Sequence, residues 1–373
     1  MKPILICLTL ALFHCACSAP DSRADEAEAF SKIQPLVEQA IESGELPGAV
    51  VCFADAKKIR YLKAFGDRQV EPSREPMTTD TVFDLASITK PVATATSVLL
   101  LSDQGKLDLQ RPVADYMPEF GANEKQSITI EQCLLHTSGL IPDNALSDYD
   151  DGPEVAWQRI CQLKPRSTPG SKFSYSDVGF IVLGKLVAQV SGTTLDQYAS
   201  QNLYGPLNMQ DTRFNPPSSL HQRIAATEKQ GDGWLRGQVH DPRAARLDGV
   251  AGHAGLFSSA SDLVTFAQNL MAAADDQSPV FSAAMFQQMT APHTVPRGTR
   301  TLGWDHQSPY SSNRGEALSG AAFGHGGFTG TVLWIDPEKQ LIFVFLSSRL
   351  HPDGVGSVNG LAGQIATLVG QQW

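Results

Sequence analysis

Hydrophobic positions change their spacing along the chain, and these changes predict where strands and helices lie. Residues 48–66 read GAVVCFADAKKIRYLKAFG, two apolar runs around a polar stretch, which predicts two strands joined by a turn near residues 54–58. Residues 328–348, FTGTVLWIDPEKQLIFVFLSS, predict a second hairpin that turns at Asp336-Pro337-Glu338-Lys339. From residue 87 to about residue 250 the pattern is helical and is interrupted by loops rich in proline and glycine.

Helices are predicted near both ends of the chain. Residues 30–43 carry apolar side chains at near-helical spacing, and residues 358–373 (VNGLAGQIATLVGQQW) form an apolar closing segment. Strands at both ends that enclose a helical middle predict an α/β (α+β) fold: one antiparallel sheet formed from both chain ends, flanked by helices, with a mainly helical lobe inserted. We expect the α/β part to span about residues 30–95 and 252–373, and the helical lobe about residues 96–251.

The first residues have the layout of an export signal. Lys2 precedes an apolar run over residues 4–13 and then small residues, and this run is shorter than the roughly 20 apolar residues of a membrane span. We expect residues 1–19 to be a signal peptide that directs export to the periplasm or cell envelope. Cys17 is a candidate for lipidation and a membrane anchor, and ordinary cleavage one or two residues later is the alternative. Residues 20–29, PDSRADEAEA, are polar and acidic and predict a tether.

Charge and cysteine content exclude some classes of function. The chain of 373 residues has a formal net charge of −10, which argues against nucleic acid as a partner because nucleic-acid binding needs a basic stripe. Beyond the signal, Cys52, Cys133 and Cys161 stand at wide spacing, so we interpret them as small buried hydrophobic residues, with one disulfide left open. No stretch resembles HExxH, and we expect no catalytic metal and no cofactor. The sequence does not indicate an oligomeric state.

A serine and a lysine three residues apart stand at the head of the first long apolar stretch, in SITKP over residues 87–91. Proline is tolerated in a first helical turn, so Ser87 is expected at a helix N-terminus, where backbone N–H groups favour negative charge. Lys90 returns to the same face, and poor solvation there would lower its pKa, so that a neutral amine could take the proton of the serine hydroxyl. Alone, this pair is equally explained as a helix cap followed by a solvated lysine.

Two further segments carry candidate chemistry. Tyr175 stands in KFSYSD (172–177), directly before an apolar helical pattern, and is therefore expected on a loop at a helix entrance. Residues 323–330, FGHGGFTG, lead into the C-terminal hairpin. Three glycines within four residues let another backbone come close, as a peptide-like substrate would.

Together these segments resemble the three active-site motifs of the class C β-lactamase and penicillin-binding-protein-like serine hydrolases. The motifs are Ser87-x-x-Lys90, Tyr175-Ser176-Asp177 and His325-Gly326-Gly327, and residues 134–140 (LLHTSGL), 255–270 and 302–304 (LGW) match as well. The resemblance covers the chain from about residue 30 to its end and implies a β-lactamase/transpeptidase-like fold. It also implies roles for an acylated nucleophile (Ser87), its activator (Lys90), a general base and acid (Tyr175), an oxyanion hole (the backbone N–H groups of Ser87 and Phe328) and a substrate-binding strand edge (His325, Gly326, Gly327).

Two positions depart from the pattern of the members that hydrolyse β-lactams. His325 stands where lysine is usual and is mostly neutral at pH 7. Asp177 stands where asparagine is common and brings a negative charge, which we expect close to the substrate. Efficient β-lactamase activity is therefore not expected.

A narrower resemblance bears on the substrate. Residues 239–257 and 347–354 (SSRLHPDG) resemble a subgroup that contains a D-alanyl-D-alanine carboxypeptidase-like penicillin-binding protein and muropeptide amidases. It implies that Arg349 supplies the cation that His325 does not, and binds either a peptide carboxylate or a group next to a lactyl-amide bond of the substrate. His253 is expected to contact the substrate, whereas His240 and Asp241 either line the cleft or satisfy backbone groups.

These patterns predict an exported serine hydrolase that works through an acyl-enzyme on an amide or ester bond. The expected substrate is a peptidoglycan-derived peptide or muropeptide. The alternatives are a carboxylesterase acting on small acyl esters, a weak β-lactamase, and a penicillin-binding receptor that does not release the bound acyl group by hydrolysis.

Overall fold

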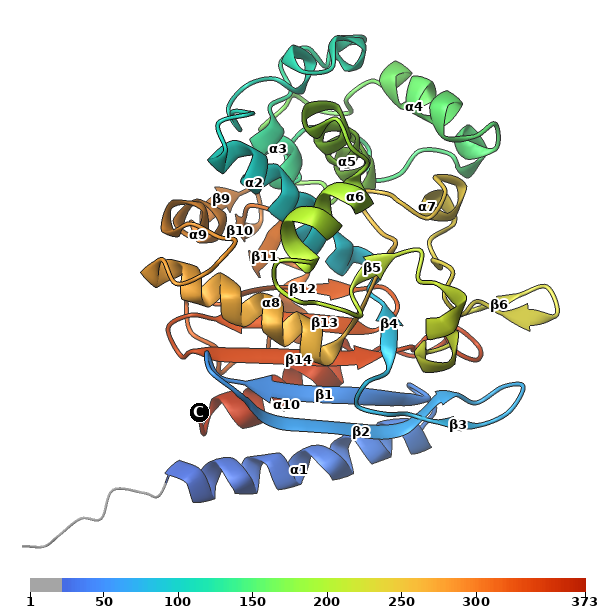
Figure 1. Cartoon of the computed structure of the whole chain (residues 1–373), viewed down its shortest axis with the longest axis vertical. Helices are drawn as coiled ribbons and strands as arrows, with labels where there is room; N and C mark the ends of the chain where they lie inside the picture. The colour runs from blue at the N-terminus through green and yellow to red at the C-terminus, as the bar shows by residue number, and fades with distance from the viewer. Residues whose placement is uncertain (1–21) are drawn as a thin grey trace, which may run out of the picture.

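The computed structural model describes residues 22–373, which are built around one sheet of nine strands (Figure 1). The strands are β1 (Gly48–Ala54), β2 (Ile59–Gln69), β3 (Glu75–Pro76), β4 (Val82–Asp84), β5 (Arg213–Phe214), β6 (Lys229–Gln230), β7 (Gly233–Trp234), β8 (Leu256–Ser259), β9 (His293–Val295), β10 (Gly298–Thr301), β11 (Trp304–Gln307), β12 (Phe323–Gly327), β13 (Thr331–Asp336) and β14 (Leu341–Ser347). The order across the large sheet is β3-β2-β1-β14-β13-β12-β11-β10-β9, and β4-β8-β5 and β6-β7 form two small sheets.

Strands from the two ends of the chain lie side by side at the centre of the large sheet. Strand β1 pairs antiparallel with β2 on one side and with β14 on the other. Strands β13 and β14 form the predicted C-terminal hairpin, with Leu333 opposite Val344. The predicted hairpins and the sheet formed from both chain ends are therefore confirmed.

Helices cover both faces of this sheet. They are α1 (Ser22–Glu42), α2 (Thr96–Asp103), α3 (Ile130–Leu134), α4 (Pro153–Gln162), α5 (Asp177–Ser191), α6 (Leu195–Ala199), α7 (Pro242–Arg246), α8 (Ala260–Ala272), α9 (Ala283–Thr290) and α10 (Asn359–Gly370). In Figure 1, α1 lies below the sheet, and α2 to α7 form the helical lobe above it. Helix α10 is the predicted closing helix and is confirmed.

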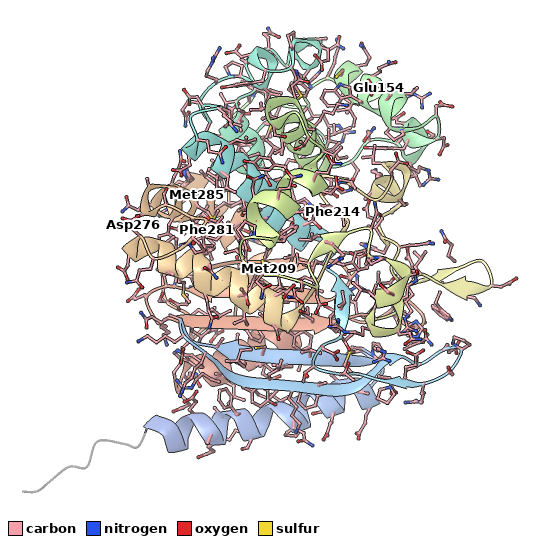
Figure 2. The ribbon with its side chains drawn as sticks, viewed as in Figure 1. Glu154, Met209, Phe214, Asp276, Phe281 and Met285 are labelled. Atoms are coloured by element: carbon pink, nitrogen blue, oxygen red, sulfur yellow. The ribbon has the colours of Figure 1, made fainter. Side chains whose placement is uncertain are left out.

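Alternating side chains of β1 separate two hydrophobic cores, since successive residues of a strand point to opposite faces. Val51 and Phe53 pack with α1 and α10, whereas Val50 and Cys52 pack with the larger core under α2 and α8. This explains why β1 is buried along its whole length and has an uninterrupted apolar sequence. Residues Phe281 and Met285, labelled in Figure 2, extend the larger core beneath α9.

The prediction of a tether over residues 20–29 is wrong from Ser22 onward, because α1 begins there. The packing of this helix explains the difference: Ala29 and Ile33 are buried against the sheet, and Glu26 forms an ion pair with Arg60 of β2. Residues 1–21, with the predicted signal peptide and Cys17, lie outside the described residues.

Cys52, Cys133 and Cys161 are all buried free thiols, in agreement with their interpretation as small hydrophobic residues. Burial raises the pKa of Cys52 and Cys133 to about 12, so neither is a nucleophile at neutral pH. Within residues 22–373, no single helix is long and apolar enough to cross a membrane. The segments Asp177–Ser191 and Leu195–Tyr204, which are bent relative to each other, are together long and apolar enough by length and composition alone.

Candidate active site

Ser87 lies in a single helical turn, Ala86–Ile88, directly after β4. The residue before it, Ala86, has a φ of 47°, a conformation that costs energy for a residue with a Cβ. Asp84 holds this turn, because its Oδ1 accepts a hydrogen bond of 2.9 Å from the Ala86 N–H. The backbone N–H of Leu85 is bonded to Leu256 of β8. Neighbouring strands thus impose the strained turn that presents the serine hydroxyl.

Lys90 begins the next helical turn, Lys90–Ala95, which continues into α2. Its side chain is fully buried, and its Nζ contacts three oxygens: Ser87 Oγ at 3.0 Å, the His253 carbonyl at 3.0 Å and Asp177 Oδ1 at 2.6 Å. The first two oxygens accept hydrogen bonds from the ammonium, and the Asp177 carboxylate forms an ion pair with it. The lysine is therefore not a solvated surface charge.

The predicted lowering of the Lys90 pKa is wrong. Burial does lower the pKa of Lys90, but the negative charge of Asp177 and the Tyr175 hydroxyl raise it by more, so that the net direction is upward. The pKa of Tyr175 is also raised, by burial first and by Asp177, while Lys90 opposes the rise. Lys90 is thus a cation held by Asp177, and Tyr175 is a partly buried phenol beside it.

Changing Asp177 to asparagine should shift the pH dependence of the reaction to lower pH. Without the carboxylate, the pKa of Tyr175 loses one of its upward contributions and burial of Lys90 is no longer offset, so both groups release their protons at lower pH. We expect the acidic limb of the kcat/KM profile to move down by about 1 to 3 pH units, since that is the usual effect of one charge at this range. An unmoved acidic limb would show that neither proton governs the rate.

Tyr175 is held from both sides by His136. The Ser174 N–H donates to the His136 carbonyl at 2.9 Å, and the Ser176 N–H donates to His136 Nδ1 at 3.0 Å. The two rings stack with centroids 4.4 Å apart. Burial, and then the positive charge of Arg300, lower the pKa of His136 well below its usual value, so it is a neutral acceptor. Its place in LLHTSGL therefore serves to position the tyrosine loop.

The glycine-rich segment forms β12, whose edge faces the serine turn. His325 is paired with Leu333 of β13, and its Nδ1 lies 2.7 Å from the Gly326 carbonyl. Burial and the nearby charges of Arg300 and Lys90 lower its pKa well below the usual value, so this histidine brings no positive charge at pH 7. Thr331 of the next strand donates to the Leu85 carbonyl at 3.0 Å, which ties the strand to the serine turn.

Changing Gly327 to alanine should lower kcat/KM by about 10²-fold. A Cβ here would lie 2.1 Å from Thr331 Oγ1 and 2.4 Å from the Leu85 carbonyl oxygen, so the strand must move away from the serine turn. The loss corresponds to one misplaced oxyanion donor. Gly320→Ala is the matched control, because its Cβ would meet no atom within 4 Å. Equal activity of the two variants would contradict the close approach.

A cleft of about 240 Å³ brings several of the predicted residues together. Six of them line it: Ser87, Tyr175, His325, Gly326, Gly327 and Phe328. Lys90 lies beneath Ser87, as its contact with the hydroxyl requires. The hydroxyl, the amine and the phenol thus meet at the glycine-rich strand, although they come from segments far apart in the sequence.

Asp177 and His253 lie behind the cleft rather than at the substrate. Asp177 is engaged with Lys90, and His253 offers Lys90 its carbonyl oxygen while its Nε2 lies 2.9 Å from Asp241 Oδ1. One donor atom from each of Asp177, Asp241 and His253 lies within 4.8 Å of the others, a spacing that could suit a metal. The Lys90 ammonium contacts Asp177 and so occupies the place at this cluster that a metal ion would take as the positive charge.

Arg349 and His240 support the loop of Phe328. Arg349 Nε donates to the Phe328 carbonyl at 2.8 Å, and its guanidinium lies 4.4 Å from the centre of the phenylalanine ring. The His240 ring also stacks on the Phe328 ring, with centroids 5.8 Å apart, and the His240 backbone N–H donates to Asp84 Oδ2 at 2.8 Å. Arg349 does not line the cleft, and its Nε and Nη1 donate to the carbonyls of Phe328 and Gly356, so its expected contact with a substrate carboxylate stays a prediction.

Sequence reasoning missed five residues that line the cleft: Arg300, Asp305, Tyr310, Asn313 and Asn359. Arg300 and Asp305 flank the LGW stretch, which resembles the family. Two opposite charges on either side of a family motif could have indicated that these residues belong to the site. The other three come from loops and a helix start that carry no recognisable pattern.

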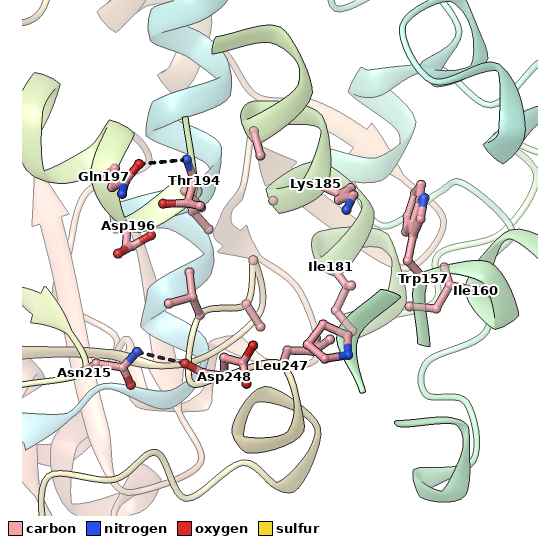
Figure 3. Close-up of a pocket in the computed structure, with 17 residues that line it drawn as sticks. Trp157, Ile160, Ile181, Lys185, Thr194, Asp196, Gln197, Asn215, Leu247 and Asp248 are labelled. Carbon is pink, nitrogen blue, oxygen red and sulfur yellow. Dashed lines mark hydrogen bonds between the residues drawn. The ribbon is translucent and has the colours of Figure 1, made fainter. Parts of the chain in front are cut away.

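A larger cavity of about 510 Å³ lies elsewhere, between α4, α5, α6 and the segment 247–252 (Figure 3). Trp157, Ile181 and Leu247 give it an apolar wall, with Lys185 and Asp196 among its polar members. None of the predicted catalytic residues lines it. The smaller cleft is therefore the candidate active site.

Comparison with known proteins shows similarity over most of the chain. The family model described as Beta-lactamase matches residues 33–367. A Bacillus subtilis (strain 168) protein named "N-acetylmuramyl-L-alanine amidase" is 34% identical over 361 residues, covering 86% of this chain and 81% of the relative. An Escherichia coli (strain K12) protein named "Putative D-alanyl-D-alanine carboxypeptidase" is 30% identical over 401 residues, covering 94% and 92%. A crystal structure of a class C beta lactamase has a TM-score of 0.75 at 19% identity, covering 94% of this chain and 99% of that one, a likeness of fold.

Proposed function

This chain belongs to the beta-lactamase family of serine hydrolases, and on that premise we propose that it cleaves an amide bond in a peptidoglycan-derived peptide or muropeptide through an acyl-Ser87 intermediate. The observation that carries the proposal is the contact of 3.0 Å between Lys90 Nζ and Ser87 Oγ at the base of the cleft. The names of the relatives, an amidase of N-acetylmuramyl-L-alanine and a D-alanyl-D-alanine carboxypeptidase, support this substrate class.

The proposed reaction begins with attack of Ser87 Oγ on the carbonyl carbon of the substrate. Because Asp177 keeps Lys90 protonated, we assign Tyr175 as the base that takes the serine proton. The raised pKa of Tyr175 makes its phenolate the minor form at neutral pH, and the adjacent ammonium stabilises that reactive form. A C–O bond forms as the carbonyl π bond opens, and the resulting oxyanion accepts hydrogen bonds from the backbone N–H groups of Ser87 and Phe328. Tyr175 then gives its proton to the leaving nitrogen as the C–N bond breaks.

Hydrolysis of the acyl-serine repeats these steps with water as the nucleophile. Tyr175 takes a proton from water, the tetrahedral intermediate forms on the same oxyanion donors, and the proton is returned to Ser87 Oγ as the ester bond breaks. Every proton removed is thus returned within the cleft, and no cofactor is needed for the balance.

We also propose that the protein acts outside the cytoplasm, where peptidoglycan lies. The support is the layout of residues 1–19, with Lys2 followed by a short apolar run, and Cys17 remains the proposed anchor.

A carboxylesterase acting on small acyl esters is a second candidate, favoured by one observation. His325 is a neutral residue at the position where the β-lactam-hydrolysing members carry a permanent cation. A cleft without that charge would accept uncharged acyl groups.

The test compares the wild type with Ser87→Ala on a muropeptide digest, with products identified by mass spectrometry. Loss of a terminal D-alanine or of the lactyl-linked peptide by the wild type alone supports the proposal and identifies the bond. Hydrolysis of short p-nitrophenyl esters without any change in the muropeptides favours the esterase. Stable labelling of Ser87 by a penicillin without turnover of any substrate would instead indicate a receptor.

A further inference from the structure

Arg300 is a buried cation at the active-site cleft that sequence reasoning did not single out. It stands on β10, next to the hairpin that leads to β11, and its side chain is fully buried. It nevertheless forms part of the cleft lining, together with Ser87 and Tyr175. Its guanidinium lies 5.5 Å from the ring centre of Phe173.

One edge of this guanidinium has no partner among residues 22–373. Nη1 donates to Asp305 Oδ1 at 3.1 Å, but neither Nε nor Nη2 has an acceptor, and both atoms are shielded from solvent. Nε and Nη2 project their N–H bonds in parallel from the same side of the planar group, and this is an edge that a carboxylate can bind with both oxygens. A buried charged donor without a hydrogen-bond acceptor costs free energy of folding. The simplest explanation is that a ligand supplies the acceptor.

Asp305 does not fill that role. Its Oδ1 takes only the single Nη1 contact, and its Oδ2 accepts a hydrogen bond of 2.7 Å from Ser311 Oγ. Both oxygens are thus engaged on the far side of the guanidinium, and the Nε and Nη2 edge stays open.

The other candidate cations, a lysine and an arginine, do not line the cleft, and each has partners in the protein. Lys90 is bound by Asp177, and Arg349 donates to the carbonyls of Phe328 and Gly356. His325 brings no charge, because burial, with the positive field of Arg300 next, lowers its pKa. Among the described residues that line this cleft, Arg300 is the one lysine or arginine, and its Nε and Nη2 are unused.

We propose that Arg300 binds a carboxylate of the substrate through its Nε and Nη2 edge, which makes the protein selective for peptides that carry a free carboxylate. The inference rests on the proposed function and narrows its substrate class. The rings of Phe173 and Tyr310 stand beside the group, with centroids 6.1 Å apart, and Tyr310 is 51% exposed at the cleft mouth. Shielding by these rings keeps the attraction between carboxylate and guanidinium little screened by water.

The test uses an N-acyl-D-alanyl-D-alanine with a free carboxylate and the same peptide with a C-terminal amide. For each peptide we measure the concentration that halves the rate at which an uncharged fluorophosphonate labels Ser87. This concentration reports binding and does not require cleavage. For the wild type we expect the acid to protect at a concentration at least 10-fold lower than the amide. For Arg300→Gln we expect the two to become equal, each measured against that variant's own labelling rate in the absence of peptide.

Arg300→Gln strands the charge of Asp305, so the same comparison is made in Arg300→Gln combined with Asp305→Asn, with thermal unfolding measured for both. Equal protection by acid and amide in the wild type, or an acid preference that persists in either variant, would overturn the proposal. Each of these outcomes is a ratio within one variant, so it can be read wherever Ser87 still reacts with the fluorophosphonate. Failure of the wild type to label at Ser87 would instead count against the proposed function itself.

Discussion

Replacing Ser87 with alanine will abolish turnover, with kcat/KM reduced by about 10³-fold or more, while the fold is retained. Ser87 lines the cleft and its hydroxyl is the one serine hydroxyl that contacts Lys90 in the described part of the chain, and loss of the nucleophile in serine hydrolases leaves only the residual rate that binding and the oxyanion donors supply. The change removes one oxygen that is bonded to Lys90 and leaves Asp177 and the His253 carbonyl to hold the ammonium. The measurements are ester and muropeptide hydrolysis, labelling by a fluorophosphonate, and thermal unfolding.

Ser261→Ala is the matched control for this change. Ser261 is exposed on α8, away from the cleft, so its loss should leave both labelling and turnover unchanged. Labelling that persists in Ser87→Ala would mean that another nucleophile reacts. Turnover within 10-fold of the wild type would remove the serine from the mechanism.

Local sequence patterns predicted the sheet because its central strands are buried on both faces. Strands β1 and β14 are buried at every position, so each is an uninterrupted apolar run that is visible without knowledge of its neighbours. The turn of the last hairpin is marked by Asp336 and Pro337 in the same local way. Helix α1 was misjudged at its start because the helix there depends on a contact between Glu26 and Arg60, which are 34 positions apart.

The same distinction explains what sequence could say about the site. Ser87 and Lys90 are neighbours on one helical segment, so their contact follows from spacing alone. The pKa of Lys90 does not follow, because the opposing carboxylate of Asp177 belongs to another helix and decides the direction of the shift. Arg349 was expected at the substrate because arginine suits carboxylates, but its position is set by two backbone carbonyls that no sequence pattern reveals. Arg300 was missed for the same reason, since burial and unused donors are properties of the folded chain.

The buried pair of Lys90 and Asp177 has a structural and a chemical role, and substitution can separate them. Lys90→Met will reduce kcat/KM by about 10³-fold, because proton transfer from Ser87 loses the cation that supports it. It will also destabilise the fold by about 3 to 5 kcal/mol, since the Asp177 carboxylate is left without its partner at 2.6 Å in a mostly buried position. Urea unfolding and steady-state kinetics measure the two losses independently.

The double change Lys90→Met with Asp177→Asn provides the decisive comparison. The methionine fills the lysine's buried volume, and the asparagine removes the stranded charge, so most of the lost stability should return. Activity should not return, because a thioether neither accepts a proton nor supports the Tyr175 phenolate. If instead activity recovers together with stability, then the lysine contributes only to folding, and the proton of Ser87 must leave by a route that does not involve the ammonium. Because the two residues are in direct contact, their effects on stability should be strongly non-additive, whereas the double variant should be about as inactive as Lys90→Met.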